Sequence, residues 1–232
     1  MKIYHFLKEI ILLLSANHQR NIIMEKKVAS FEKYEIFMAD QLCLDEISRF
    51  IVKENYVHHL KTTIEQNIDT EIFNVLTEEN YLYSPDSKIY IARTYNGQII
   101  GCIRSFKWDK QKILPFEKIY GINPVRAIHG GEKYNFWHIG RFAVTKLSSI
   151  TTITLFKQLM VLAVKPIVED KDSYLIAEVD SKLLKVVNAL GLTTCQVGQP
   201  INYLASETTP IFASKKGVSK FYSKYSYLLE AV

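Results

Sequence analysis

The feature that most constrains the fold is an Asn-Gly pair, Asn96-Gly97, which lies between two strand-like segments. Residues 88–95 and 98–106 are rich in isoleucine and aromatic residues, which favour extended backbone. Asn-Gly between two such runs is a strong hairpin signal, because both turn positions need positive φ angles that these residues adopt readily. The pattern therefore predicts an antiparallel hairpin within residues 88–106.

A second segment, residues 136–145, predicts a strand that carries two titratable side chains, His138 and Arg141, among apolar ones. A helix is expected to follow over residues 149–164 and to stop before Pro166, because the residue before a proline disfavours helical backbone. The start of this helix is rich in hydroxyl groups. Unpaired N–H groups at a helix start attract anions, so this junction is a candidate site for an anionic group.

The remaining elements alternate between strands and helices, as apolar spacing, caps and turn residues indicate. Strands are expected at 34–38, 174–179, 194–197 and 210–214. Helices are expected at 42–52, at 57–80 (one helix or a broken pair), between a Ser181 cap and a Gly191 stop, and at 218–228, with residues 108–135 irregular. A hairpin joined to a central strand–helix–strand–helix unit predicts a mixed sheet in an α/β fold.

The composition is that of a globular protein. Hydrophobic residues make up 48% and charged residues 23% of the 232 residues, which allows one large core. No Gly/Ser or Pro tract marks a linker, so we expect a single domain over residues 31–232 after an N-terminal helical extension over residues 1–30. The apolar run at residues 10–14 is too short to cross a bilayer. It is a short helix, a segment upstream of a true start at Met24, or a removed targeting segment.

Charge and cysteine usage exclude some classes of function. The net charge of +5 is scattered, whereas nucleic-acid-binding proteins cluster their basic residues, so no nucleic-acid partner is expected. The shortness of the apolar run at residues 10–14 predicts no integral membrane association. Three cysteines lie far apart, and their odd number argues against a secreted disulfide framework. We therefore expect a reduced, cytoplasmic setting. The histidines show no convincing metal-ligand spacing, so no metal is expected.

Four short motifs follow one another on the expected elements over roughly residues 32–214. They are Gly101-Cys102-Ile103-Arg104, the strand segment 138–144 with Arg141-Phe142, the turn Leu190-Gly191-Leu192, and Gly198-Gln199-Pro200 followed by Tyr203. Together they resemble the GNAT superfamily of acyltransferases, most closely its branch of acyl-homoserine-lactone synthases and bacterial N-acyl amino acid synthases. The resemblance implies a mostly antiparallel central sheet with a splayed pair of parallel strands, flanked by helices.

Two departures from the family pattern bear on chemistry. The family has a glutamate three residues before the arginine of the fourth strand, and this chain has His138 there. The glycine-rich pyrophosphate loop of typical coenzyme A users is absent from residues 146–151, as it is in the autoinducer-type branch. The resemblance therefore implies a thioester co-substrate carried by acyl carrier protein or coenzyme A, with no permanently bound cofactor. A tyrosine that protonates the leaving thiolate in many GNAT enzymes is replaced by Val187.

Three residues are candidates for catalysis. His138 is a candidate general base, because an imidazole titrates near neutrality, and its alternative is a hydrogen-bonded core histidine. Arg141 is expected either to clamp a carboxylate or support the base, or to form an ordinary ion pair. Arg104 needs a partner, which is either a substrate carboxylate or a protein carboxylate such as Asp86. His138 and Arg141 face opposite sides of an ideal strand, so the site requires a bulge at Gly140.

Further candidates bind the thioester or the acceptor. Backbone pairing along the splayed strand is expected to hold a pantetheine arm, and the residues assigned to the thioester are Phe142, Val144, Lys146, Ser148, Ser149 and Thr151. Helix capping is the alternative role of the hydroxyl residues. Asp86, Trp108, Phe136 and Tyr203 are assigned to the substrate, and for the aromatic residues the alternative is packing in the core.

These observations predict an N-acyltransferase that moves an acyl group, expected to be a fatty acyl group, from a thioester carrier to the amine of a small molecule such as an amino acid. Two alternatives remain open from the sequence. One is an acetyl-coenzyme A acetyltransferase with a degenerate loop, and the other is a non-catalytic ligand-binding module, which the loss of the family glutamate would favour.

Overall fold

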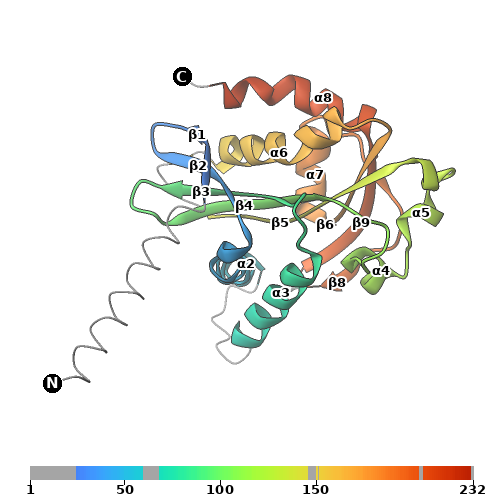
Figure 1. The fold of residues 1–232 in the computed structure, drawn as a ribbon, viewed down its shortest axis with the longest axis horizontal. Helices are drawn as coiled ribbons and strands as arrows, with labels where there is room; N and C mark the ends of the chain where they lie inside the picture. The colour runs from blue at the N-terminus through green and yellow to red at the C-terminus, as the bar shows by residue number, and fades with distance from the viewer. Residues whose placement is uncertain (1–24, 60–67, 146–149, 151, 204–205, 231–232) are drawn as a thin grey trace, which may run out of the picture.

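A computed structural model describes residues 25–59, 68–145, 150, 152–203 and 206–230 (Figure 1). Within these residues the strands form one nine-stranded sheet. The strands are β1 (Lys26–Ser30), β2 (Tyr34–Ala39), β3 (Lys88–Thr94), β4 (Ile99–Lys107), β5 (Asn135–Val144), β6 (Ser173–Asp180), β7 (Cys195–Gln196), β8 (Ile201–Tyr203) and β9 (Ser206–Ser214). The spatial order is β1-β2-β3-β4-β5-β6-β9-β7, and β8 pairs with β9.

The sheet is antiparallel except for one central pair. β5 and β6 run parallel, with Asn135 opposite Ser173 and His138 opposite Ile176, and α6 (Thr152–Glu169) connects them. Parallel neighbours need such a crossover, whereas the remaining pairs are joined by turns or longer returns. This arrangement confirms the predicted mixed sheet of an α/β fold.

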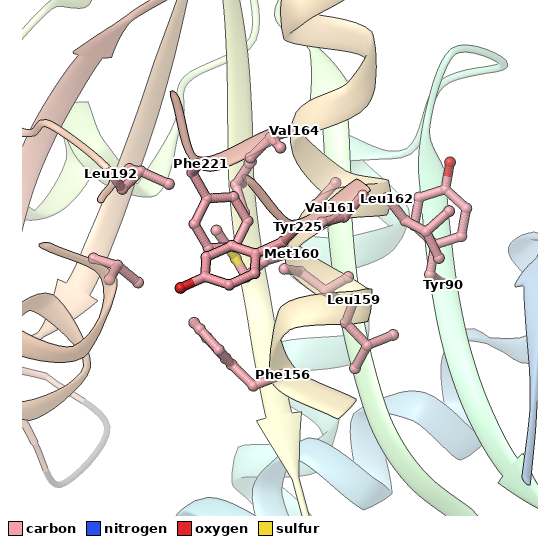
Figure 2. Close-up of a cluster of buried hydrophobic side chains, with 14 of the residues drawn as sticks. Tyr90, Phe156, Leu159, Met160, Val161, Leu162, Val164, Leu192, Phe221 and Tyr225 are labelled. Carbon is pink, nitrogen blue, oxygen red and sulfur yellow. The ribbon is translucent and has the colours of Figure 1, made fainter. Parts of the chain in front are cut away.

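Helices cover both faces of the sheet (Figure 1). On one face, α6 and α8 (Lys215–Tyr225) pack on the strands with α7 (Ser181–Ala189) beside them. Figure 2 shows part of this core, where Met160 and Val164 of α6 meet Phe221 and Tyr225 of α8. The opposite face carries α2 (Leu44–His59) and α3 (Ile68–Leu82), with the short helices α4 (Pro115–Tyr120) and α5 (Pro124–Ala127) near one end of the sheet. Single 3₁₀ turns complete the list: η1 (Gln41–Cys43), η3 (Gly131–Lys133) and η4 (Ser226–Leu229).

The predicted hairpin is confirmed as β3–β4, with a different turn from the one expected. Gly97 has a φ of 86°, but Asn96 is not among the described residues with positive φ. The Gly97 N–H donates to the Thr94 carbonyl at 2.9 Å, and the Thr94 N–H donates to the Gln98 carbonyl at 3.0 Å. These bonds close a three-residue loop in which a turn centred on Tyr95 and Asn96 is followed by a left-handed glycine, so only the glycine needs positive φ.

The helix predicted over residues 149–164 was expected to end before Pro166, and this end is wrong, because α6 continues through the proline to Glu169. Val164 and Ile167 are fully buried on either side of it. The proline removes one N–H donor, but the chain around it gains burial of about 1.5–3 kcal/mol per large apolar side chain by staying helical. Tertiary packing therefore overrides the local signal.

The cap of α7 also differs from the prediction. Asp180, and not Ser181, is the N-cap, since its carboxylate accepts from the N–H groups of Lys182 and Leu183. Ser181 is the first helical residue and donates to Glu207 instead. The predicted stop at Gly191 is confirmed by its left-handed φ of 102°.

Two strands and several short helices lie where the sequence predicted none. Of the predicted helical extension over residues 1–30, residues 1–24 lie outside the described part, and Lys26–Ser30 forms strand β1 against β2. β8 extends the sheet beside β9. The segment 108–135, predicted to be irregular, contains α4, α5 and η3, and their caps and prolines explain the turn residues seen there.

Candidate active site

A β-bulge in β5 brings the two titratable residues of this strand to one face of the sheet. Cys102 pairs with Ala143 and Arg104 pairs with Gly140, so Arg141 and Phe142 together face the single residue Ile103. Arg141 adopts a left-handed φ of 56°, which is uncommon for a residue with a side chain. The extra residue reverses the side-chain alternation, and His138 and Arg141 therefore both reach Arg104 and its partners. The predicted bulge is confirmed, one residue later than Gly140.

Gly140 has a second role in this geometry. A Cβ atom added there would lie 3.1 Å from Cε1 of His138 and 3.7 Å from Nη2 of Arg104. The contact with His138 would be tighter than usual, whereas the contact with Arg104 would be an ordinary van der Waals contact. The missing side chain thus leaves the space in which the imidazole and the guanidinium meet.

Beyond the bulge, β5 and β6 separate. Their pairing ends at His138 opposite Ile176, although β5 continues to Val144 and β6 to Asp180. A cavity of about 600 Å³ opens between the two strands, lined by residues 138–144 of β5 and by the end of β6. This size lies within the usual range of small-molecule sites, about 300–1,000 Å³. The splayed parallel pair is therefore accompanied by a site large enough for a ligand.

The cavity has a polar and an apolar side. On the face of α2 and α3 it is lined by Glu54, Glu78 and the buried charged residues near the bulge. On the face of α6 and α7 the lining is mostly apolar and comprises Phe142, Phe156, Met160, Leu183, Val186, Val187, Leu192 and Ile211. Figure 2 shows three of these residues, Phe156, Met160 and Leu192, within the buried core. An extended ligand with a polar centre and an apolar tail fits this distribution.

Two arginines and two glutamates form an ion-pair cluster on the polar side. Nη1 of Arg104 donates to both carboxylate oxygens of Glu79 at 2.6 Å, and Nε of Arg141 donates to Glu79 at 2.6 Å. Arg141 also pairs with Glu78. Arg104 and Glu79 are 2% and 3% exposed, so these charges are held almost without water. Burial opposes ionisation of Glu79, but Arg104 and Arg141 outweigh it and lower the pKa of this carboxyl below its usual range.

His138 is buried between this cluster and a third glutamate. Its Nδ1 lies 3.3 Å from Nη2 of Arg104, and its Nε2 lies 2.9 Å from Oε2 of Glu178 on β6. The ring also packs against Phe106, with 5.2 Å between centroids. Burial raises the pKa of the Glu178 carboxyl, but its electrostatic interaction and hydrogen bond with His138 outweigh burial and lower it. Glu178 is therefore ionised at neutral pH.

The structure brings together five of the predicted residues. His138, Arg141, Arg104 and Phe142 line the cavity, and so does Val144. Arg104 has a protein carboxylate as its partner, which was one of the two alternatives, but the partner is Glu79. Asp86, the carboxylate suggested from the sequence, is exposed in the turn before β3.

The other predicted residues lie elsewhere or outside the described part. Trp108 and Phe136 pack in a buried aromatic cluster with Phe116 and Phe212, and they are not among the described residues that line the cavity. For these two aromatic residues the structure therefore supports packing in the core, which was the alternative to substrate binding. Lys146, Ser148, Ser149 and Thr151 lie outside the described residues, as does the side chain of Tyr203.

Three glutamates of the site were missed by the sequence reasoning. Glu78 and Glu79 lie on a helix whose apolar spacing was recognised, but nothing in that pattern showed that Glu79 faces the sheet. Glu178 gave a usable signal. It is the acidic residue within the nearly continuous apolar run 174–179, and a carboxylate in a strand buried on both faces needs a specific partner.

The described residues were also compared with the requirements of a metal site and of a membrane span. Those residues contain no group of three or more histidine, cysteine, aspartate or glutamate side chains arranged to hold a metal ion. In the same part of the chain, every helix is too short or too polar to span a bilayer.

Comparisons with known proteins identify the fold. No family model matches the chain, and no curated protein matches its sequence significantly. Among solved structures, FeeM, an N-acyl amino acid synthase from uncultured soil microbes, is 17% identical with a TM-score of 0.53, and the match covers 88% of this chain and 98% of FeeM. An uncharacterized protein of Bacillus halodurans is 12% identical with a TM-score of 0.51, over 88% of this chain and 96% of that one.

A third structure, from Corynebacterium glutamicum and described as histone acetyltransferase HPA2 and related acetyltransferase, is 15% identical with a TM-score of 0.50. It matches over 78% of this chain and 96% of its own. At such identities the likeness concerns the course of the backbone. With a parallel strand pair splayed beside a bulge, the described part of the chain has the GNAT fold.

Proposed function

We propose that this chain is an N-acyltransferase that moves a fatty acyl group from a thioester carrier to the amine of a small molecule. The observation that carries the proposal is the cavity of about 600 Å³ between the separated ends of β5 and β6. It joins a mostly apolar side to buried charged groups, as the transfer of an acyl chain to a polar acceptor requires.

The thioester arm is assigned to the gap between the strands. Beyond His138, β5 no longer pairs with β6, and the proposal places the extended arm along this stretch of β5. Phe142 and Val144 flank this stretch, and Phe142 packs edge-on against Phe156 of α6. The acyl chain then enters the apolar side. Lys146, Ser148, Ser149 and Thr151 follow β5 in sequence and are assigned to the phosphate of the carrier arm.

The acceptor is assigned to the polar side, next to the bulge. Arg104 and Arg141 are neutralised by Glu79 and Glu78, so their role in the proposal is to fix the buried cluster and the imidazole of His138. The hydrogen-bonded pair of His138 and Glu178 is assigned to proton transfer, because general acid–base groups must lie within hydrogen-bond reach of the reacting nitrogen and both residues line the cavity. The likeness to FeeM, an N-acyl amino acid synthase, supports an amino acid or a related amine as acceptor.

An acetyl group would leave most of the apolar lining unfilled, and this favours a fatty acyl donor over the acetyltransferase alternative.

The carrier is acyl carrier protein or coenzyme A, and the experiment distinguishes them. Purified full-length protein is incubated with acyl-carrier-protein or acyl-coenzyme A thioesters of several chain lengths and a pool of amino acids and simple amines. Mass spectrometry detects acylated amines, and a thiol reagent detects the released thiol.

We expect an amide product together with one thiol per turnover, at a higher rate for long chains than for acetyl. Acetyl transfer alone would support the acetyltransferase alternative. No amide and no thiol release with any donor would refute the proposed function, and binding of thioester without turnover would favour a non-catalytic module.

A further inference from the structure

Both ring nitrogens of His138 are already occupied. A guanidinium only donates hydrogen bonds, so Nδ1, which lies 3.3 Å from Nη2 of Arg104, must be the unprotonated, accepting nitrogen. Nε2 must then carry the proton that it donates to the ionised Glu178 at 2.9 Å. In this arrangement the imidazole donates from Nε2 and accepts at Nδ1. It has no free nitrogen with which to take a proton from an acceptor amine.

Glu178 presents the free acceptor that His138 lacks. Only its Oε2 is bound to the imidazole, whereas Oε1 is buried and has no hydrogen-bond partner. Among the described residues, this is the one buried carboxylate oxygen without a partner. The side chain is 10% exposed and lines the cavity. Buried polar atoms are nearly always satisfied, so an unsatisfied carboxylate oxygen in a cavity wall indicates a ligand group that it receives.

The remaining carboxylates of the cavity are engaged in structural bonds. Glu54 accepts from the Thr145 hydroxyl at 2.8 Å, Glu78 pairs with Arg141, and Asp180 caps α7. Each of these bonds fixes a backbone segment or another charge. Glu178 differs from them, because its Oε2 is bound to the imidazole of His138 and its Oε1 has no hydrogen-bond partner.

We infer, on the basis of the proposed function, that Glu178 is the general base of the acyl transfer and that His138 is a positioning residue that orients it. Oε1 of Glu178 accepts a hydrogen bond from the neutral acceptor amine. As the amine nitrogen forms its bond to the thioester carbonyl carbon, the nitrogen becomes acidic and gives this proton to Oε1. The C–S bond then breaks, and the leaving thiolate takes up the proton from Glu178. The products are an amide and a free thiol, and the carboxylate is regenerated.

The test compares conservative variants in the full-length protein. Glu178→Gln keeps the shape but removes the basic oxygen, and turnover should fall about 10²–10⁴-fold, as for loss of a general base, with unchanged thioester affinity. His138→Gln retains an N–H donor for Glu178 and should lose less than roughly tenfold, below that range. His138→Ala, which removes the donor, should lose more than His138→Gln. Glu25→Gln, which alters a carboxylate paired with Arg93 away from the cavity, is the matched control and should retain activity.

A second measurement does not depend on the folding of any variant. Nitrogen-15 NMR of the imidazole in the wild-type protein should show an unprotonated Nδ1 and a protonated Nε2 at neutral pH. An unprotonated Nε2, an active Glu178→Gln variant, or a His138→Gln loss as large as that of Glu178→Gln would each overturn the inference. Absence of acyl transfer by the wild-type protein would instead refute the proposed function itself.

Discussion

Replacement of Glu79 by glutamine should destabilise the protein more than any surface charge change. Glu79 is 3% exposed and accepts three contacts of 2.6 Å, two from Arg104 and one from Arg141. Glutamine keeps the volume but removes the charge and turns an N–H donor toward the guanidinium groups. Breaking a buried ion pair by removing one partner costs about 3–5 kcal/mol, because the remaining charge stays buried without compensation.

For a domain of this size, 1 kcal/mol corresponds to about 2–4 °C, so the melting temperature should fall by roughly 6–20 °C. Urea unfolding followed by circular dichroism measures the free energy of unfolding, and the slope with denaturant should stay unchanged. The matched control is Glu46→Gln. Glu46 also pairs with an arginine, Arg93, but its side chain is 55% exposed. Its loss should cost less than about 1 kcal/mol.

The double variant Glu79→Gln, Arg104→Met separates charge burial from packing. If the cost comes from the uncompensated guanidinium, then replacement of Arg104 by an apolar side chain should restore part of the lost stability. Equal stabilities of Glu79→Gln and Glu46→Gln would refute the argument. So would a double variant less stable than Glu79→Gln alone.

Three further predictions concern the same site. Acid should destabilise the protein, because Glu79 and Glu178 have pKa values in the folded protein below their ordinary 4.5. The stabilisation from their ionised forms is present above that pH and is lost as the pH falls through the folded pKa values. The midpoint of urea unfolding, measured at several pH values, reports this loss. Leu183→Trp, which fills part of the apolar lining, should shorten the acyl chain that is accepted, as measured by turnover against a series of thioesters. Gly140→Ala places a Cβ 3.1 Å from the imidazole and should lower turnover severalfold in steady-state assays, without a change in thioester affinity.

Each of these predictions has a result that contradicts it. Urea midpoints that do not change between neutral and acidic pH would show that the two carboxylates contribute nothing through ionisation. Leu184→Trp is the control for the cavity, since Leu184 is half-buried on the same helix but is not part of the described lining. If Leu183→Trp and Leu184→Trp changed the chain-length preference equally, the acyl chain would not bind against the cavity wall formed by Leu183. Wild-type turnover in Gly140→Ala would show that the imidazole need not hold its position.

The local elements of the fold were readable from short-range signals. Asn96-Gly97 predicted the β3–β4 hairpin, and apolar runs predicted the strands on both sides of α6. Gly140, between His138 and Arg141, indicated where the strand that became β5 had to bulge. The pairing of β5 with β4 shows this bulge one residue later, at Arg141. These features depend on backbone preferences of neighbouring residues, which the sequence records directly.

The errors arose where distant contacts outweighed local preference. Pro166 signalled a helix end, but burial of Val164 and Ile167 keeps α6 continuous through it. The sequence predicts a substrate-binding role for Trp108 and Phe136, yet they pack with each other in the core, with 6.1 Å between their ring centroids. A strand aromatic gives the same sequence pattern in either place, because only the arrangement of neighbouring elements decides which face is covered.

The sequence by itself determined which residues carry the candidate chemistry of β4 and β5: an arginine on one strand, and a histidine and an arginine on the next, with a glycine between them. Only the tertiary structure decided what those groups do, because each is completed by a glutamate more than 20 residues away in the chain. Glu79 from α3 neutralises the two arginines, and Glu178 from β6 takes the imidazole proton. A buried charge takes its ionisation state from its nearest partners in space, and chain packing brings those partners together.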